Sequence, residues 1–436
     1  MRVALHSIGL RSSLAIFIVT VSWTTTCATT EKILHSFKHN SKDGTNPIAG
    51  LIFDASGNLY GTATAGGVYG YGTVFELTPK AGGGWTEKIL HNFNNDGKDG
   101  YNPGTSLTID AAGNLYGTTY GGGGTTCGCG TVFEVLPKAG GGWTEKILHN
   151  FNHDGKDGYA PETAALTIDA SGNLYGTTPL GGRKTISVCP GGCGTVYELT
   201  PKAGGKWTER ILHSFDTTGR GHIPLAGVIF DTAGNLYGTT IKGGSGKLCV
   251  NKHTSCGTVY ELTPKAGGND WTQTTLYSFD ENGGDGYYPD SNLIFDAAGN
   301  LYGTTDYGGD SVGGTVFELM PTGGGWTEMI VHSFSGSPDG LFPMGGVTLN
   351  ATGNLYGTTY RGGTNDLGTV FELVPEVGGG WTETIVHSFN NNGKDGNSPG
   401  GVGLIFDASG NLYGTTPTGG STSCTEGCGT VFEFTP

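Results

Sequence analysis

One hexapeptide, Gly-Asn-Leu-Tyr-Gly-Thr, occurs seven times in the 436-residue chain, at intervals of 54 to 65 residues. The copies begin at Gly57, Gly113, Gly172, Gly234, Gly299, Gly353 and Gly410. A second string, Gly-Thr-Val-Phe/Tyr-Glu, also occurs seven times, from Gly72 to Gly429. A chain with such a period stacks copies of one supersecondary unit, because a single copy cannot bury its own apolar face.

Each unit predicts four short strands. In the first unit these span residues 51–54, 59–62, 73–78 and 85–93. The fourth has Trp, Glu, Ile, His and Phe on alternate positions, which is the period of a strand. The Asp and Gly between the first two strands suit a tight hairpin turn. The 83 glycines and 18 prolines exclude long helices, because both residues destabilise helix interiors.

Four strands per unit at this repeat length predict an all-β fold, a seven-bladed β-propeller with four antiparallel strands per blade. The chain ends indicate how the ring closes. Residues 31–37 match the fourth strand of a unit, and residues 430–435 match the third. We therefore expect the N-terminal strand to complete the last blade, which also removes exposed sheet edges. The propeller is predicted to span residues 29–436.

Residues 1–28 have the pattern of a secretory signal peptide. Arg2 and Arg11 precede an apolar run over residues 14–21, and small residues follow it. This run is much shorter than the roughly 20 residues that cross a bilayer. We expect cleavage near Ala28, secretion of the mature chain and no transmembrane segment.

The strings GNLYGTT and GTVFELTP resemble the GloVer tandem repeat of secreted bacterial proteins. The resemblance covers all seven units and implies export from the cell, but it implies no particular activity. The DxxGNLY turn is also similar, less closely, to the turn of NHL-type propellers, some of which are binding modules and a few of which are lyases.

Eight of the nine cysteines fall in the connections between the second and third strands. These connections have 9, 11, 16, 17, 9, 9 and 13 residues, and only the four longer ones contain cysteine. In an exported protein such pairs predict disulfides within each connection, and zinc ligation is the alternative. The predicted pairs are Cys127/Cys129, Cys189/Cys193, Cys249/Cys256 and Cys424/Cys428.

The connections after the second and fourth strands are expected to lie on one face of the ring, and they carry most of the variation between units. Tyrosines there could stack on sugars or peptides. The run Arg220-Gly221-His222 replaces the Lys-Asp-Gly-Tyr of other units, and a binding site should break the symmetry of a repeat. The predicted ligand-binding residues are Arg220, His222, Tyr101, Tyr159, Tyr287, Tyr288 and Arg361.

We interpret two repeated features of the sequence as structural rather than functional. Six histidines share one position of the fourth strand, and a residue repeated around a ring is predicted to pack rather than to catalyse. They are His35, His91, His149, His213, His332 and His387, with Tyr277 in the remaining copy. The Asp-Gly turns that follow resemble calcium loops in composition, but a simple turn is the favoured interpretation. We therefore predict no metal site and no cofactor, with Ca²⁺ at these turns as the alternative.

The sequence favours a secreted, monomeric binding or scaffold module that engages a glycan, peptide or protein through the face with variable loops. The alternative is an extracellular polysaccharide-active enzyme, or another lyase or hydrolase, with its site at the central depression. Glycoside hydrolysis needs two placed carboxylates, and the repeats offer no asymmetric pair that stands out. The net charge of -15 disfavours nucleic acids and anionic membranes as partners.

Overall fold

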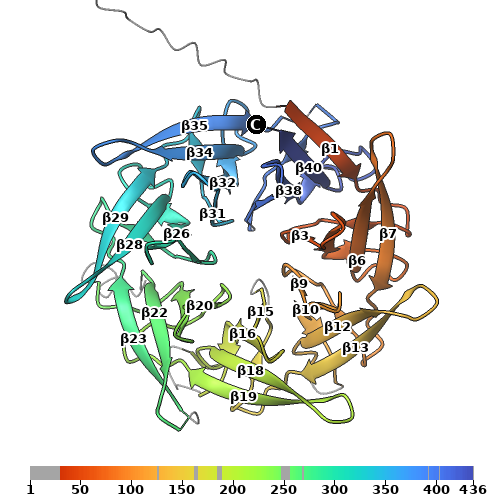
Figure 1. The fold of residues 1–436 in the computed structure, drawn as a ribbon, viewed down its shortest axis with the longest axis horizontal. Coiled ribbons are helices and arrows are strands. Elements are labelled where there is room, and N and C mark those ends of the chain that lie inside the picture. The colour runs from red at the N-terminus through yellow and green to blue at the C-terminus, as the bar shows by residue number, and fades with distance from the viewer. Residues whose placement is uncertain are drawn as a thin grey trace, which may run out of the picture.

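The computed structural model describes residues 30–435, apart from residues 125–126, 162–164, 184–188, 247–255, 268–269, 391 and 402. Seven antiparallel four-stranded sheets stand in a ring, so the fold is a seven-bladed β-propeller, as predicted (Figure 1). The proposed signal peptide lies outside these residues. Within them no helix is long and apolar enough to cross a membrane.

Each blade runs from a short inner strand to a long outer strand (Figure 1). The first strands are β3 (Ile52–Phe53), β9 (Thr108–Ile109), β15 (Thr167–Ile168), β20 (Ile229–Phe230), β25 (Ile294–Phe295), β31 (Val347–Leu349) and β37 (Ile405–Phe406). The second strands are β4 (Leu59–Ala63), β10 (Leu115–Thr119), β16 (Leu174–Thr178), β21 (Leu236–Thr240), β26 (Leu301–Thr305), β32 (Leu355–Thr359) and β38 (Leu412–Thr416).

The third and fourth strands form the outer half of each blade. The third strands are β6 (Thr73–Pro79), β12 (Thr131–Pro137), β18 (Thr195–Lys202), β22 (Thr258–Pro264), β28 (Thr315–Thr322), β34 (Thr369–Pro375) and β40 (Thr430–Thr435). The fourth strands are β7 (Trp85–Asn92), β13 (Trp143–Asn150), β19 (Lys206–Ser214), β23 (Trp271–Ser278), β29 (Gly325–Ser333), β35 (Trp381–Ser388) and β1 (Thr30–Ser36).

The ring closes as the sequence predicts. Strand β1 pairs antiparallel with β40, from Thr30 opposite Thr435 to Ser36 opposite Thr430. In Figure 1 the red β1 therefore lies beside the dark blue β40, on the outer edge of blade 7. Hydrogen bonds between the two ends of the chain thus hold the first and last blades together.

The repeated motifs follow from contacts within and between blades. In blade 1 the Asp54 carboxylate accepts hydrogen bonds from the backbone N–H groups of Ser56 and Asn58, which holds the Gly-Asn turn. The Gly61 position excludes any side chain, because a Cβ there would lie 2.6 Å from Cζ of Phe75. Phe75 in turn packs on Phe37 of the preceding blade, with ring centroids 5.2 Å apart. Apolar contacts of this kind fill the space between neighbouring blades.

Candidate functional site

Six small two-stranded sheets gather the variable connections on one face of the ring. Each pairs the connection that enters a blade with the connection between the second and third strands of that blade. They are β2 (Gly44–Thr45) with β5 (Ala65–Gly66), β8 (Gly100–Tyr101) with β11 (Gly121–Gly122), β14 (Gly158–Tyr159) with β17 (Leu180–Gly181), β24 (Gly286–Tyr287) with β27 (Tyr307–Gly308), β30 (Gly340–Leu341) with β33 (Arg361–Gly362), and β36 (Gly396–Asn397) with β39 (Thr418–Gly419). We call the surface formed by these sheets and their loops the variable-loop face.

Four aromatic side chains meet on the variable-loop face where blades 5 and 6 adjoin. Tyr287 and Tyr307 are cross-strand partners, and their rings stack with centroids 5.6 Å apart and planes 14° apart. The Tyr288 ring stands edge-on to both, at 5.3 and 5.9 Å. The Phe342 ring lies 5.2 Å from that of Tyr307. We call these four residues the aromatic cluster.

The aromatic cluster is partly open to solvent. Tyr307 is 37% exposed, and Tyr287 and Tyr288 are half-buried. Burial raises the pKa of the Tyr287 and Tyr288 hydroxyls above the usual value, so both are neutral at physiological pH. Neutral phenols can donate and accept hydrogen bonds next to an apolar ring face.

Two carboxyl groups lie close in sequence to the aromatic cluster. Asp290 follows Pro289 in the connection into blade 5, and Asp306 directly precedes Tyr307. The Oδ1 atoms of both are buried, and no donor among the described residues reaches them. Burial raises the pKa of Asp306 to about 6 and, with the neighbouring Asp306 charge, raises that of Asp290 well above its usual range. Neighbouring carboxyl groups that raise each other's pKa favour one shared proton, and we call Asp290 and Asp306 the carboxyl pair.

The carboxyl pair breaks the symmetry of the repeat, and sequence analysis missed it. The signal was present, because only the fifth unit has an acidic residue both after the proline of the entering connection and after the Gly-Thr-Thr of the second strand. The residues at these two positions in units 1 to 7 are Ile48/Thr64, Gly104/Tyr120, Glu162/Pro179, Leu225/Ile241, Asp290/Asp306, Met344/Tyr360 and Gly400/Pro417.

A cavity of about 590 Å³ opens on the same face and includes the same two positions of blade 6 in its lining. Met344, Tyr360, Arg361 and Glu426 are among the residues that line it. The Arg361 guanidinium lies 3.3 Å from the Asp366 carboxylate and 5.8 Å from the centre of the Tyr360 ring. Arg361 thus borders this cavity with its charge already partnered by Asp366.

Two other predicted tyrosines lie in separate sheets of the variable-loop face. Tyr101, in β8, has its ring 5.9 Å from that of Tyr71. Tyr159, in β14, has its ring 4.8 Å from that of His153. The structure therefore brings Tyr287 and Tyr288 together but leaves Tyr101 and Tyr159 at other blades.

The Arg220–His222 run does not offer an imidazole to solvent. His222 is only 6% exposed. Its backbone forms a single antiparallel bridge with that of Lys242, at the position where other blades have a small two-stranded sheet. Burial and the Lys242 charge lower the pKa of His222, so this side chain is neutral. Arg220 is exposed, and its carbonyl accepts a hydrogen bond of 2.7 Å from Gln273 Nε2.

Among the described residues, three cysteine pairs are joined as disulfides within their connections. They are Cys127–Cys129, Cys189–Cys193 and Cys424–Cys428. Each closes a variable loop next to the third strand of its blade. Cys249, the predicted partner of Cys256, lies outside the described residues.

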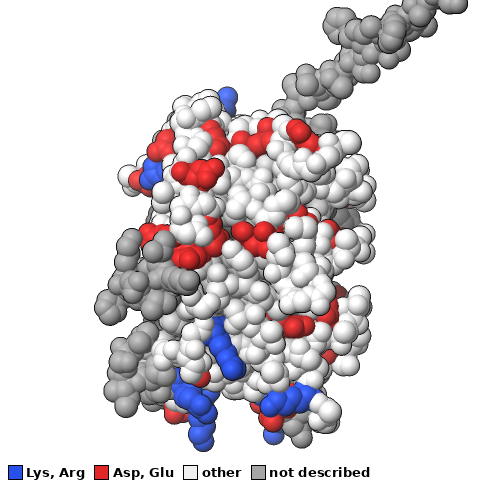
Figure 2. Space-filling view, turned by 90° about the vertical axis from the view of Figure 1, so that its left-hand side faces the viewer, with Lys and Arg blue, Asp and Glu red and all other residues white. Residues whose placement is uncertain are grey.

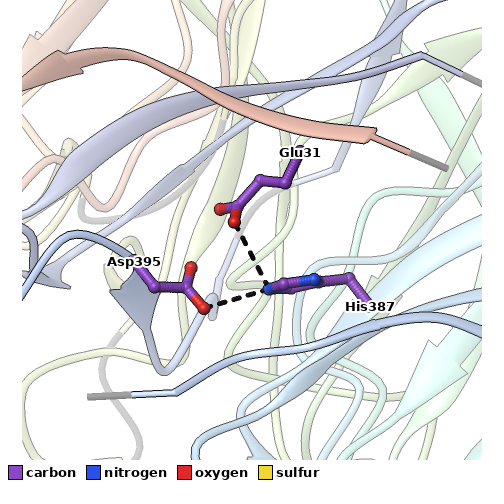
Figure 3. A group of neighbouring side chains, drawn as sticks. All are labelled: Glu31, His387 and Asp395. Atoms are coloured by element: carbon purple, nitrogen blue, oxygen red, sulfur yellow. Dashed lines mark hydrogen bonds and ion pairs between the residues drawn. The ribbon is translucent and has the colours of Figure 1, made fainter. Parts of the chain in front are cut away.

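A second kind of polar cluster recurs where blades adjoin. Five junctions each bring together a His of one fourth strand, the Asp of the turn that follows it and a Glu of the next blade's fourth strand. In Figure 3 Glu31 of β1, His387 of β35 and Asp395 point toward one another. The five interblade clusters are His35/Asp43/Glu87, His91/Asp99/Glu145, His149/Asp157/Glu209, His332/Asp339/Glu383 and His387/Asp395/Glu31.

Sequence analysis predicted that these histidines pack, and each ring does lie edge-on to the Phe two residues later, as His35 does to Phe37 at 4.6 Å. Their carboxylate partners were not foreseen. Burial, together with the adjacent Asp, raises the pKa of Glu31 to about 8 and of Glu87 and Glu209 to about 9. Two carboxyl groups this close need a proton or a cation between them.

The repeat itself decides the family. A family model described as the Gloeobacter/Verrucomicrobia repeat matches residues 15–249 and 184–432. The chain belongs to this family. The GloVer resemblance of the repeated strings is thereby confirmed. No curated protein matches the sequence of this Gloeobacter/Verrucomicrobia repeat protein.

Solved structures are similar to this Gloeobacter/Verrucomicrobia repeat protein at low sequence identity. An ancestral GH74 enzyme is 10% identical over 92% of this chain and 48% of its own, with a TM-score of 0.53. A candidate 6-phosphogluconolactonase from Bacteroides uniformis is 13% identical over 79% of this chain and 86% of its own, with a TM-score of 0.49. At 10% identity the likeness to the GH74 enzyme shows the propeller fold alone.

The outer edge of this Gloeobacter/Verrucomicrobia repeat protein is acidic where Figure 2 views it. Asp and Glu side chains form several groups along this edge, and the few Lys and Arg side chains concentrate at its lower end. The net charge of -15 agrees with that picture.

Proposed function

We propose that this protein is an extracellular carbohydrate-binding module and that the aromatic cluster on the variable-loop face is its binding site. In this proposal residues 1–28 direct secretion and are removed, and the mature propeller acts as a monomer. The disulfides support an oxidising location, because such bonds persist outside the cytosol.

The single observation that carries the proposal is the aromatic cluster. Its exposed ring, Tyr307, offers an apolar surface to the C–H face of a sugar, and the stack on Tyr287 holds that ring in place. The neutral hydroxyls of Tyr287 and Tyr288 can hydrogen-bond to sugar hydroxyls. The acidic surface favours a neutral glycan over a polyanionic one.

Replacement of Tyr307 by Ala is expected to weaken binding to a neutral polysaccharide at least tenfold. Stacking of a nucleobase on one aromatic ring contributes about 1–3 kcal/mol, and we expect stacking of a sugar on Tyr307 to be of similar size. A tenfold change in affinity corresponds to about 1.4 kcal/mol. Affinity electrophoresis against a panel of neutral polysaccharides, followed by calorimetry on the retained ones, measures the effect. Tyr69→Ala is the matched control, since Tyr69 is an exposed tyrosine of blade 1.

If Tyr307→Ala and Tyr69→Ala are retained equally strongly by the polysaccharide, the aromatic cluster does not bind the glycan. If no polysaccharide retains the protein and a peptide or protein binds it instead, the proposed glycan ligand is wrong and the ligand belongs to another class.

A second candidate function is hydrolysis at the carboxyl pair. Two carboxyl groups with separated pKa values can act as acid and base, and Asp290 and Asp306 are such a pair. Binding is preferred because the Oδ1 atoms of both groups are buried. If the protein releases reducing sugar from a polysaccharide and Asp306→Asn abolishes this release, the enzyme is favoured over the binding module.

A further inference from the structure

The five interblade clusters share one geometry. The distance from His Nε2 to the Asp carboxylate is 3.1 to 3.5 Å in all five. The distance from His Nε2 to the Glu carboxylate is 3.6 or 3.7 Å in four of them. In every cluster the three ligand atoms lie within 4.8 Å of one another.

Buried oxygens without a donor recur in the same clusters. The Oε1 atom accepts no hydrogen bond in any of the five glutamates, which are Glu31, Glu87, Glu145, Glu209 and Glu383. Asp157 and Asp395 also have an unpaired Oδ1, although only 4% and 2% of their side chains are exposed. An unpaired buried carboxylate oxygen costs free energy unless a cation or a proton satisfies it.

We propose that the five interblade clusters are divalent metal sites that join neighbouring blades. Each site supplies one imidazole nitrogen and two carboxylate oxygens, a donor set that suits Zn²⁺ and similar first-row ions. Zinc bonds of about 2.0–2.2 Å place tetrahedral ligands about 3.4 Å apart, close to the His–Asp and His–Glu separations of these clusters. The charge of the ion offsets that of the two carboxylates.

Two junctions of the same ring lack the donor set and provide internal controls. Between blades 3 and 4 His213 is present, but Arg220 stands in place of the Asp and Gln273 in place of the Glu. There Gln273 Nε2 donates to the Arg220 carbonyl at 2.7 Å. The two carboxylates have thus been lost together, as expected if they act as a pair.

At the junction of blades 4 and 5 the imidazole is missing instead. Tyr277 replaces the His, and its hydroxyl donates to Asp285 Oδ2 at 3.0 Å. Glu328 completes the pair of carboxyl groups, and its Oε1 is again unpaired. Restoring the His here should therefore create a further site.

Zinc stoichiometry tests the proposal. The untagged mature protein is equilibrated with Zn²⁺, freed of unbound ion by gel filtration and measured by mass spectrometry of the metal. We expect about five ions per chain, one for each interblade cluster. His387→Ala should lose one ion, Tyr277→His should gain one, and the control His213→Ala should change nothing. Zn²⁺ should also raise the melting temperature of the chelator-treated protein.

The opposite results would overturn the proposal. Equal metal content in the parent and in His387→Ala, both folded by circular dichroism, would mean that the cluster of His387, Asp395 and Glu31 binds no ion. Glu383→Gln provides a second variant, because the amide keeps the shape of the side chain and removes one metal ligand. Unchanged zinc content in Glu383→Gln would likewise exclude the metal site.

Discussion

Removal of β1 should prevent the propeller from closing. A variant that begins at Phe37 is expected to be insoluble or to melt at least 10 °C below a variant that begins at Thr30. Strand β1 is the outer strand of blade 7, and without it β40 becomes an open sheet edge that can pair with other molecules.

The expected loss is large because β1 contributes to two separate cores. Leu34 packs in the cluster between blades 7 and 1, and Ile33 packs in the cluster between blades 6 and 7. Both side chains are partly buried, so losing each aliphatic contact costs up to about 2 kcal/mol, against a total stability of about 5–15 kcal/mol. The Lys32–Glu433 ion pair, at 2.8 Å, is lost as well.

Soluble yield and thermal melting by circular dichroism measure this effect. The variant that begins at Thr30 is the control, since it lacks only residues that precede β1. Melting temperatures within 2 °C of each other would show that pairing of β1 with β40 does not hold the ring.

Asp290→Asn is expected to stabilise the protein at pH 8 and to change little at pH 4. A carboxyl group whose pKa is raised in the folded state stabilises fully below its unfolded pKa, and that stabilisation is lost as the pH rises through the folded value. The pKa of Asp306 rises from 3.8 to about 6 through burial, and Asp290 shifts in the same direction. The loss between pH 4 and pH 8 is about 3 kcal/mol for Asp306 alone, at about 1.4 kcal/mol per pKa unit.

An asparagine at position 290 cannot ionise and can donate to Asp306 at every pH, so the variant should escape the part of the loss that comes from Asp290 and keep the part that comes from Asp306. Urea unfolding at pH 4 and pH 8 gives the two free energies of unfolding for parent and variant. Asp310→Asn, at an exposed position of the same blade, is the control. If Asp290→Asn and the parent lose equal stability between the two pH values, the carboxyl pair does not share a proton.

The repeat made the architecture predictable. The Gly-Asn-Leu-Tyr-Gly-Thr string contains part of a turn, a buried strand and a second glycine, Gly61 in blade 1, that must lie against Phe75, so each copy marks the same place in a blade. The first predicted strand, residues 51–54, is longer than β3, which ends at Phe53. The difference arises because Asp54 belongs to the turn, where its N–H donates to the Asn58 carbonyl.

Contacts between units could not be predicted in the same way. The interblade clusters join a His and an Asp of one unit to a Glu whose position depends on how blades pack, and sequence spacing does not give that distance. The burial of His222 likewise depends on its pairing with Lys242 of the same blade. The carboxyl pair was detectable only by aligning the seven units position by position and asking where acids coincide.

The pairing of Thr30 with Thr435 also bears on how the gene could be rearranged. Because both ends of the described chain meet in one sheet, a short linker could join them. New termini could then be introduced at any of the other connections between blades. A circularly permuted protein of this kind would keep every blade, and its two chain ends would lie in another part of the ring.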